Sequence, residues 1–476
     1  MKKTNCPLCI DCDGTLIKTD LLHEAFFLML KQYPLGLLFL PFWLLKGKAY
    51  LKLRLAEKVS FSWAELPYRE DVIQLIKEAK SDNRQVVLAT ASPLVWANGI
   101  ANHLGCFDQV LATEKNINLA GKNKVNRLIN LFGERNFDYA GDSKVDLQVW
   151  AHASGAIVVT SDSELTKRAS AIVSYVQVIT TPSAQFIDYL RALRVHQWLK
   201  NFLIVVPLLA AHQINSIDGL VQVLYAFIAF SLCASSVYVL NDLLDLDSDR
   251  QHIRKRKRPF AACTIPLWHG MLMVPLLLGV AFAVSLLLPS RFILLLAAYF
   301  VMTLAYSIRL KRQVIVDVML LAGLYTMRII AGAAATMITP SFWLLAFSMF
   351  IFLSLALVKR YSELLITLQS NKQEAAGRGY SVNDLPVLMS IGVSSGLGSV
   401  LILALYLNNP ETNLMYPNTM WLWLMPPLLL YWVSRMWMKA HRGQVDDDPV
   451  VFAARDWQSL LVLLISACIF IAALKL

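Results

Sequence analysis

The C-terminal part of the sequence, from about Leu199 onward, consists of long apolar runs separated by short polar loops. A chain can bury such runs only in a lipid bilayer, where one helical span takes about twenty apolar residues. The sequence is 57% hydrophobic and 16% charged, with a mean hydropathy of +0.51, whereas soluble domains are about 25% charged. We therefore predict an all-α polytopic membrane domain over residues 200–476. Its spans, about nine, lie at 200–212, 217–240, 267–288, 292–309, 314–337, 342–358, 387–407, 418–434 and 457–474.

The charges of the loops predict how this domain is oriented. Lys and Arg gather before Asn201 and in the segments 250–258, 309–312, 359–378 and 435–455. The alternate loops hold almost none, so the basic loops are predicted to be cytoplasmic. The N-terminal part is then cytoplasmic as well, and the C-terminus lies on the opposite side of a bacterial-type inner (plasma) membrane. Because these loops account for the net charge of +11, we predict no nucleic-acid partner. The oligomeric state stays open.

Residues 1–180 mix charged and apolar residues as a globular domain does. Buried, strand-like runs alternate with helical patterns, which favours an α/β domain with a parallel, Rossmann-like sheet. No basic stretch feeding an apolar core precedes it, so we expect no signal peptide. The expected organisation is an α/β domain at 1–180 with a helical cap at about 20–75, an amphipathic linker at 181–199, and the membrane domain at 200–476.

Three cysteines, Cys6, Cys9 and Cys12, lie near the start of the chain and raise the possibility of a metal or redox site. No second cysteine pair or nearby His pair completes a tetrahedral set. The cysteines fall inside an apolar run, "LCIDCDGTL", and we interpret them as small residues of a buried strand.

Polar residues follow several of these strands. Asp11 and Asp13 flank a turn at Gly14, and "QVVLATASP" ends in the hydroxyls of Thr90 and Ser92. Lys124 opens a later helix, and the strand in "FDYAGDSKVD" leads to Asp142 and Asp146. Because parallel strands end at one edge of a sheet, these groups are expected to share a site. Paired carboxylates with a lysine suit phosphoryl transfer assisted by a hard cation.

These four motifs, in this order, resemble the haloacid dehalogenase superfamily and its phosphatases in particular, over about residues 7–160. The resemblance implies that Asp11 is the nucleophile, Asp13 the general acid/base, and that Thr90 and Lys124 hold phosphoryl oxygens. It implies Mg²⁺ held by Asp11, Asp13 and Asp142, with Asp146 supporting the site. Lys122 is an alternative to Lys124, Cys12 stands where an aliphatic residue is expected, and a catalytically inactive relative kept as a scaffold remains possible.

The expected cap contains a long apolar stretch that Lys31 and two prolines interrupt, which argues against a membrane span. Its leucines and aromatic residues, with Lys46, Lys48 and Lys52 beside them, suit a face that lies on the membrane surface. Ordinary packing of the cap over the α/β domain explains the same composition, and both interpretations stay open.

An acidic segment, "NDLLDLDSDRQHIRKRKRPFA", follows directly on an apolar run. Asn241, Asp245 and Asp249 have the i, i+4, i+8 spacing that places them along one face of a helix, and Asp242 is near that face. Carboxylates gathered beside a bilayer need cations, and Mg²⁺ bound to a diphosphate would neutralise them. The basic run from Arg250 to Arg258 also indicates that this loop is cytoplasmic.

This segment resembles the first aspartate motif of the UbiA-type intramembrane prenyltransferases, whose fold has nine transmembrane helices. The stretches "LRVHQWLKN", "YSIRLKRQVIVDV", "MRIIAGAAAT" and "KRYSEL" further resemble decaprenyl-phosphate phosphoribosyltransferases. The loop from Lys359 to Tyr380 lacks the second pair of aspartates found in aromatic prenyltransferases. A basic loop there suits a sugar diphosphate donor and a lipid phosphate acceptor. The departures, Ile253 and Phe260, are small.

The resemblance implies Mg²⁺ bound by Asn241, Asp245 and Asp249, with Asp242 also catalytic, and substrates that are phosphoribosyl diphosphate and a polyprenyl phosphate among membrane lipids. Arg194, Lys200, Arg258, Lys359 and Arg360 would bind phosphate oxygens, and Asp317 would orient a partner. Further substrate-binding residues would be Arg250, Lys257, Tyr306, Lys311, Arg328 and Glu363.

Two activities on one chain suggest consecutive steps of cell-envelope biosynthesis. The transferase would make polyprenyl-phosphoryl-5-phosphoribose, and the phosphatase would remove its 5-phosphate, because tethering raises the effective concentration of the product. Two alternatives are an aromatic prenyltransferase of the ubiquinone or menaquinone type, which uses a polyprenyl diphosphate, and a non-catalytic membrane scaffold.

Overall fold

The computed structural model describes residues 6–114, 118–252, 254–369, 378–410, 415–445 and 448–475. The chain divides into two compact units, which we call the first unit and the second unit. The first unit comprises residues 1–193 and 238–274, and the second comprises residues 194–237 and 275–476. The acidic segment after Asn241 therefore belongs to the same unit as the N-terminal α/β domain. The boundaries between the units fall within α11 (Ile217–Leu244) and within α13 (Leu267–Ser285).

The first unit is built on a six-stranded sheet in the order β3-β2-β1-β4-β5-β6. Every paired strand is parallel, and β1 lies between β2 and β4. The strands read as short apolar runs because a parallel sheet is covered on both faces. They are β1 (Leu8–Ile10), β2 (Val86–Pro93), β3 (Gln109–Thr113), β4 (Asp138–Gly141), β5 (Gly155–Val159) and β6 (Val176–Ile179).

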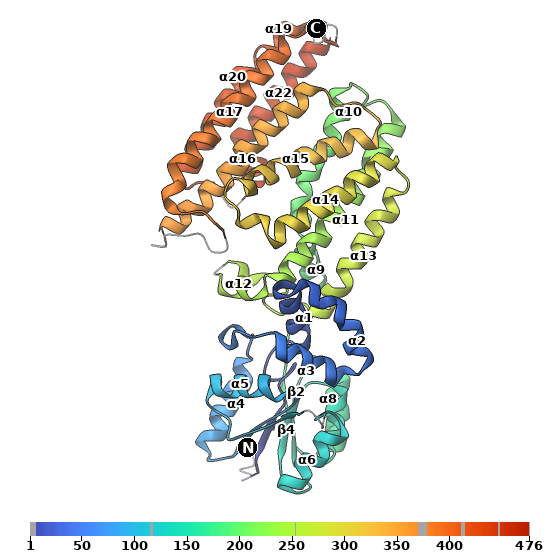
Figure 1. Ribbon diagram of the computed structural model, residues 1–476, viewed down its shortest axis with the longest axis vertical. Helices are drawn as coiled ribbons and strands as arrows, with labels where there is room; N and C mark the ends of the chain where they lie inside the picture. The colour runs from blue at the N-terminus through green and yellow to red at the C-terminus, as the bar shows by residue number, and fades with distance from the viewer. Residues whose placement is uncertain are drawn as a thin grey trace. The chain divides into compact units, whose positions relative to one another are not determined.

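Helices cover both faces of this sheet, as Figure 1 shows for α4 and α5 on one side and α6 and α8 on the other. One core joins Ile10 and Leu88 to Ile76 and Trp96. The core of the other face contains Cys9. Helices of the first unit are α1 (Leu21–Gln32), α2 (Leu40–Leu45), α3 (Lys48–Lys58), α4 (Glu70–Ser81), α5 (Leu94–Leu104), α6 (Lys122–Phe132), α7 (Leu147–Trp150), α8 (Ser163–Ile172), α9 (Phe186–Leu193) and α12 (Leu246–Gln251).

The segment between β1 and α4 forms the helices α1, α2 and α3, at the place of the expected cap. Helix α1 begins after Asp20, whose side chain accepts a hydrogen bond from the backbone N–H of Leu22 and caps the helix. Leu21, Ala25 and Leu28 of α1 pack into the core of the sheet face, whereas α2 has no buried residue. The cap is therefore anchored through α1 and through Leu51 and Leu55 of α3, while α2 presents apolar side chains outward.

The acidic segment packs beside α1. Helix α11 (Ile217–Leu244) ends in the first unit, and α12 begins after Asp245, which has the non-helical angles φ −104° and ψ 18°. Leu243 and Leu246 form a buried cluster with Phe260 and with Phe27 of α1. The single straight helix that we predicted from Asn241 to Asp249 is wrong, because Asp245 interrupts it.

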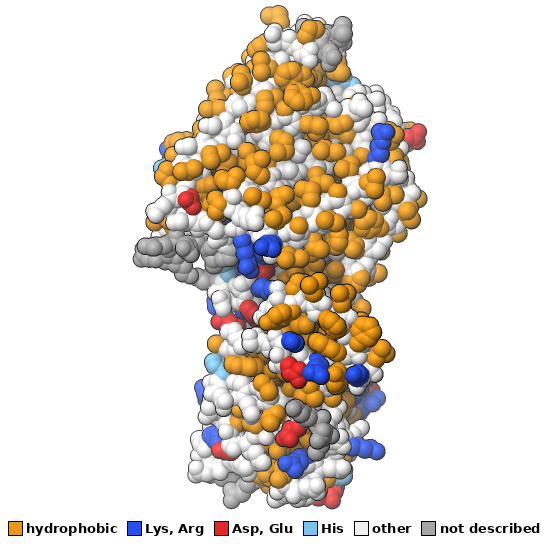
Figure 2. Space-filling view, in the orientation of Figure 1, with side chains coloured by type: hydrophobic (Ala, Val, Ile, Leu, Met, Phe, Trp, Pro, Cys, Tyr) orange, Lys and Arg blue, Asp and Glu red, His pale blue; other side chains and the backbone are white. Residues whose placement is uncertain are grey.

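The second unit is helical, with a core in which α15 (Val316–Ala335), α16 (Phe342–Gln369), α17 (Leu385–Leu407) and α20 (Met425–His441) meet. Among the described residues, seven helices are long and apolar enough to cross a membrane (Ile217–Leu244, Leu267–Ser285, Ser290–Ile308, Val316–Ala335, Phe342–Gln369, Val382–Leu407 and Trp457–Leu474). Figure 2 shows hydrophobic side chains spread over the surface of these helices. The remaining elements are η4 (Val195–Val205), α10 (Val206–Ala210), η6 (Leu310–Arg312), α19 (Thr419–Leu422), α20 (Met425–His441) and α21 (Pro449–Arg455).

Two of the nine expected spans differ from those seven. The span expected at 200–212 corresponds to a shorter apolar helical stretch, Val195–Ala210. The one expected at 418–434 falls on α19 and the 17-residue helix α20. The structure thus defines a polytopic helical membrane part, and the number of spans stays a prediction.

Candidate functional site

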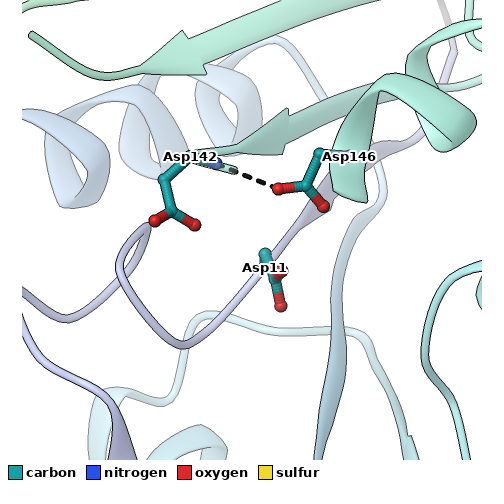
Figure 3. Close-up of side chains that lie close together, drawn as sticks. All are labelled: Asp11, Asp142 and Asp146. Atoms are coloured by element: carbon teal, nitrogen blue, oxygen red, sulfur yellow. Dashed lines mark hydrogen bonds between the residues drawn. The ribbon is translucent and has the colours of Figure 1, made fainter. Parts of the chain in front are cut away.

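Three carboxylates meet at the ends of two neighbouring strands of the first unit. Asp11 follows β1 and Asp142 follows β4, and Asp146 lies at the start of the next helical turn. Each of the three residues places one carboxylate oxygen within 4.8 Å of a carboxylate oxygen of the other two. Within the described ranges, no other set of three or more acidic, His or Cys side chains comes this close together. Figure 3 shows the three side chains together, with the backbone N–H of Asp142 donating to Asp146 at 3.2 Å.

The turn after β1 brings its backbone unusually close to this cluster. Gly14 has φ +76°, a left-handed conformation that favours glycine. A Cβ atom at this position would lie 2.1 Å from Oδ2 of Asp142, far inside a van der Waals contact. The glycine of the "DCDGTL" motif is therefore required both by the backbone angle and by the approach to Asp142.

Lys124 supplies the positive charge of the site. Its Nζ atom lies 3.0 Å from Oδ2 of Asp11 and donates to the hydroxyl of Tyr139 at 2.8 Å. The Lys124 side chain is buried, whereas Lys122, two residues earlier in α6, is exposed. The geometry favours Lys124 as the residue that holds a phosphoryl oxygen.

Asp13 is placed differently from the other three aspartates. Its Oδ1 accepts from the backbone N–H of Leu21 at 2.9 Å and its Oδ2 accepts from the Ser92 hydroxyl at 2.7 Å. Lys52 of the cap lies 3.5 Å from the same Oδ2. The group of carboxylates that approach one another comprises Asp11, Asp142 and Asp146 and does not include Asp13, so a part for the Asp13 side chain in holding the metal stays a prediction. An acid/base role agrees with these contacts.

Thr90 and Ser92 lie near the end of β2, and their hydroxyls have different partners. Thr90 is buried, and its Oγ1 accepts a hydrogen bond from the backbone N–H of Ser92 at 3.0 Å. Ser92 reaches Asp13, while Thr90 is not among the residues that line the cavity over the carboxylates. The sequence analysis missed the contact of Lys52 with Asp13. This contact depends on how α3 packs against the α/β domain, which no local sequence pattern predicts.

The electrostatics of the cluster fit a divalent cation. Burial raises the pKa of Asp11 to about 6, with Lys124 opposing and Asp146 and Asp13 adding to the rise. Burial, then Asp146 and Asp11, raise the pKa of Asp142 well above its usual range. Carboxylates that repel one another in this way suit Mg²⁺, which Asp11, Asp142 and Asp146 would hold, and the cation would neutralise charge on a transferring phosphoryl group.

The acidic segment does not form a comparable cluster. Arg258 Nη1 donates to Asp242 at 3.1 Å and to Asp249 at 2.6 Å, and both carboxylates are buried. Asp245 is 3.8 Å from Lys31 of the cap. Oδ1 of Asn241 is buried without a hydrogen-bond partner among the described residues. The expected row of Asn241, Asp245 and Asp249 is therefore replaced by Asp242 and Asp249 around one arginine. Burial raises the pKa of Asp249 despite Arg258.

Arg250 has a structural partner instead of an open phosphate site. Its guanidinium donates to both carboxylate oxygens of Glu24 in α1, at 2.6 and 3.3 Å. The Arg250 side chain is 7% exposed and that of Glu24 is 2% exposed. The charge of Arg250 is already matched inside the unit, and its substrate-binding role stays a prediction. Lys257, on a short turn at Lys255–Lys257, is exposed.

A buried ionic network occupies the second unit. Arg360 of α16 donates to Asp317 of α15 at 2.9 Å and also binds Glu363. Arg378 lies 3.7 Å from Asp317 and donates to the Tyr306 hydroxyl at 3.0 Å. Asp317 thus orients two arginines, and Tyr306 and Glu363 belong to the same group. The sequence analysis did not place Arg378 in the site, although it lies in the basic loop that ends at Tyr380. Residues 370–377 of this loop lie outside the described residues.

The other predicted residues of the second unit are dispersed. Lys200 pairs with Asp448, and Arg328 donates to Asn201 at 2.8 Å and to the Leu324 carbonyl at 2.6 Å. Arg328 is buried among these contacts, and its substrate-binding role stays a prediction. Arg194 has a left-handed φ of 52° before η4, Lys311 lies in η6, and half-buried Lys359 precedes Arg360. Their substrate roles stay predictions.

The fold and the carboxylate cluster define a membrane enzyme with a phosphatase-like domain at its N-terminus. The haloacid dehalogenase-like hydrolase model matches residues 8–150, and the UbiA prenyltransferase family model matches residues 202–473. The chain belongs to the UbiA prenyltransferase family and carries a haloacid dehalogenase-like domain.

Three relatives illustrate the similarity. Uncharacterized protein y4nM of Sinorhizobium fredii is 37% identical over 471 residues, which cover 98% of this chain and 91% of that one. Nodulation protein NoeC of Azorhizobium caulinodans is 34% identical, over 59% of this chain and 91% of that one. Decaprenyl-phosphate phosphoribosyltransferase of Mycobacterium tuberculosis is 36% identical over 192 residues, which cover 39% of this chain and 64% of that one.

Proposed function

We propose that the chain carries two activities that act in sequence. The UbiA-type part would transfer phosphoribose from phosphoribosyl diphosphate to a polyprenyl phosphate and release diphosphate. The phosphatase domain would then hydrolyse the 5-phosphate of the product, leaving polyprenyl-phosphoryl-ribose and inorganic phosphate. Both sites would use Mg²⁺ and would face the cytoplasm at a bacterial inner membrane.

The strongest support for the phosphatase is the meeting of Asp11, Asp142 and Asp146 with Lys124 at 3.0 Å from Asp11. In the proposed reaction Asp11 attacks phosphorus, the bond to the 5-oxygen breaks, and Asp13 protonates that oxygen. Asp13 then removes a proton from the water that cleaves the aspartyl phosphate. Lys124 would stabilise charge on the phosphoryl oxygens in both steps.

Support for a phosphoribosyl donor comes from the second unit and from the similarity to decaprenyl-phosphate phosphoribosyltransferase. Arg360 and Arg378 meet at Asp317, and no second pair of neighbouring aspartates occurs in the sequence from Lys359 to Tyr380. Arg360 is fully buried against Asp317 and Glu363, so Arg378, whose side chain is 21% exposed, is the arginine of this pair that would bind phosphate oxygens. Asp242 and Asp249 of the acidic segment would hold the metal-bound diphosphate, with Asn241 and Asp245 beside them.

The proposal is tested with the purified full chain in lipid nanodiscs. Given labelled phosphoribosyl diphosphate, a polyprenyl phosphate and Mg²⁺, it should release diphosphate first and inorganic phosphate second. Asp249→Asn should remove both signals, because no substrate for the phosphatase is made. Asp11→Asn should remove only the phosphate and let the phosphorylated lipid accumulate.

Two results would contradict the proposal. Phosphate release that persists in Asp11→Asn would show that the phosphatase domain does not act on the product. Turnover of a polyprenyl diphosphate with a hydroxybenzoate, and none with phosphoribosyl diphosphate, would instead assign an aromatic prenyltransferase.

A further inference from the structure

A cavity of about 1100 Å³ lies over the phosphatase carboxylates. Its floor contains Asp11, Asp13, Asp142 and Lys124. A phosphomonoester group occupies only a small part of such a volume. The rest of the cavity must therefore be matched to the remainder of the substrate, and its walls indicate what that remainder is.

One wall of this cavity comes from the membrane-enzyme part of the sequence, still within the first unit. Residues 262–269, which lead into α13, line it together with residues 180–184 and Tyr189 of α9. The Tyr189 hydroxyl lies 2.7 Å from Nδ1 of His269, so two segments far apart in sequence are bonded at this wall. The phosphatase cavity is thus incomplete without the start of a membrane helix.

The lining combines charged and apolar segments. Asp11, Asp13 and Lys124 are charged, whereas the segment 262–269 contributes Ile265, Leu267 and Trp268. Trp268 is 47% exposed and lies in the first turn of α13 (Leu267–Ser285). This helix is a candidate membrane span, and most of its residues are not buried by other parts of the protein. Tryptophan favours the membrane–water interface. An apolar chain that leaves the cavity past Trp268 would therefore enter the bilayer beside α13.

We infer that this cavity binds an amphipathic, lipid-linked phosphomonoester, and that Trp268 with the Tyr189–His269 pair selects it over water-soluble phosphomonoesters. The inference rests on the proposed phosphatase activity. The phosphate lies at Asp11 and Lys124, the polar part of the substrate lies in the middle of the cavity, and the lipid chain passes the apolar wall. Trp268 contacts the chain and not the reacting phosphorus, so it determines specificity and takes no part in the chemistry.

The test compares two substrates with the full chain in lipid nanodiscs, with inorganic phosphate as the readout. One is polyprenyl-phosphoryl-5-phosphoribose, and the other is the same head group with a methyl in place of the polyprenyl chain. We expect kcat/KM for the lipid-linked substrate to exceed that for the methyl analogue by about a hundredfold in the wild type, because apolar contact area adds binding energy. Trp268→Ala should lower this ratio about tenfold, through KM for the lipid-linked substrate.

Phe186→Ala is the matched control, because Phe186 lies in α9 with Tyr189, is exposed, and does not line the cavity. It should leave the ratio unchanged, and Tyr189→Phe should lower it less than Trp268→Ala does. If Trp268→Ala also loses turnover of the methyl analogue, the ratio is measured in Trp268→Gln instead.

A wild-type ratio near one, or a ratio that neither Trp268 variant changes, overturns the inference. Asp11→Asn is run beside these variants. If it hydrolyses both substrates at the wild-type rate, the phosphatase assignment itself fails, which is a different result.

Discussion

The first unit contains two groups of acidic side chains, and they are organised in opposite ways. Asp11, Asp142 and Asp146 come from distant parts of the sequence and bring their carboxylates together. Asp242, Asp245 and Asp249 lie within one short segment, yet Asp245 faces Lys31 while the other two share Arg258. The carboxylates of the first group repel one another, so a bound cation would stabilise them. Basic side chains of the protein already neutralise the carboxylates of the second group.

The difference follows from the backbone that carries each group. Neighbouring parallel strands end at one edge of the sheet, so residues that follow β1 and β4 must meet. A helix keeps i, i+4, i+8 residues on one face only while its angles persist, and Asp245 breaks them. Proximity in sequence is therefore a weaker guide to a shared site than topology is.

The largest expected effect is that of Gly14→Ala on the phosphatase cluster. The added Cβ would lie 2.1 Å from Asp142 Oδ2 and would displace that carboxylate. We expect phosphate release to fall by about a hundredfold or more, since small misplacements of catalytic groups cost that much. Gly105→Ala is the control, because its φ is +62° and no atom lies within 4 Å of the added Cβ. Equal loss in both variants would show that backbone strain, and not the cluster, is the cause.

The second prediction concerns the charge balance of the acidic segment. Arg258→Gln removes the guanidinium that the buried carboxylates of Asp242 and Asp249 share, which should cost about 3 kcal/mol and lower Tm. Mg²⁺ should restore more Tm in this variant than in the wild type, because the ion can replace the lost guanidinium. Lys257→Gln, at the neighbouring exposed residue, is the control and should change Tm little. An equal magnesium effect in all three proteins would contradict the idea that Arg258 sits where a cation is needed.

The third prediction tests what joins the cap to the acidic segment. Glu24→Gln removes the partner of buried Arg250, and we expect a loss of about 3 kcal/mol in the free energy of unfolding. Glu164→Gln removes the partner of Arg168 in an exposed pair and should cost less than about 0.5 kcal/mol. Thermal unfolding followed by circular dichroism in one detergent measures both. A similar, small loss in the two variants would mean that Arg250 finds another partner.

Particular residues show how far the sequence leads. The positions of Asp11 and Asp142 were predictable because buried apolar runs mark strands, and parallel strands share an edge. The choice between Lys122 and Lys124 was not predictable, because it depends on which face of α6 packs against the sheet. The sequence gives no signal that Glu24 would meet Arg250, or that a helix without Pro or Gly would be interrupted at Asp245, because tertiary packing decides both.

The smallest expected effect on stability belongs to the cap. Leu38, Phe42 and Leu45 are well exposed, and Lys46 and Lys48 beside them are exposed too. An apolar face rimmed by lysines fits an anionic bilayer surface. Because water already reaches Leu45, Leu45→Glu should change the free energy of unfolding in detergent by less than about 0.5 kcal/mol.

The same variant should weaken contact of the cap with lipid. A fluorophore attached at residue 42, in a cysteine-depleted chain in nanodiscs with anionic lipid, should emit at shorter wavelength than one at residue 95. Val95 is the control because it is exposed on α5 of the same unit and is not part of the cap. Leu45→Glu should shift the emission from residue 42 back toward that of residue 95. If the two labels already emit alike before the substitution, the apolar face of α2 does not rest on the bilayer.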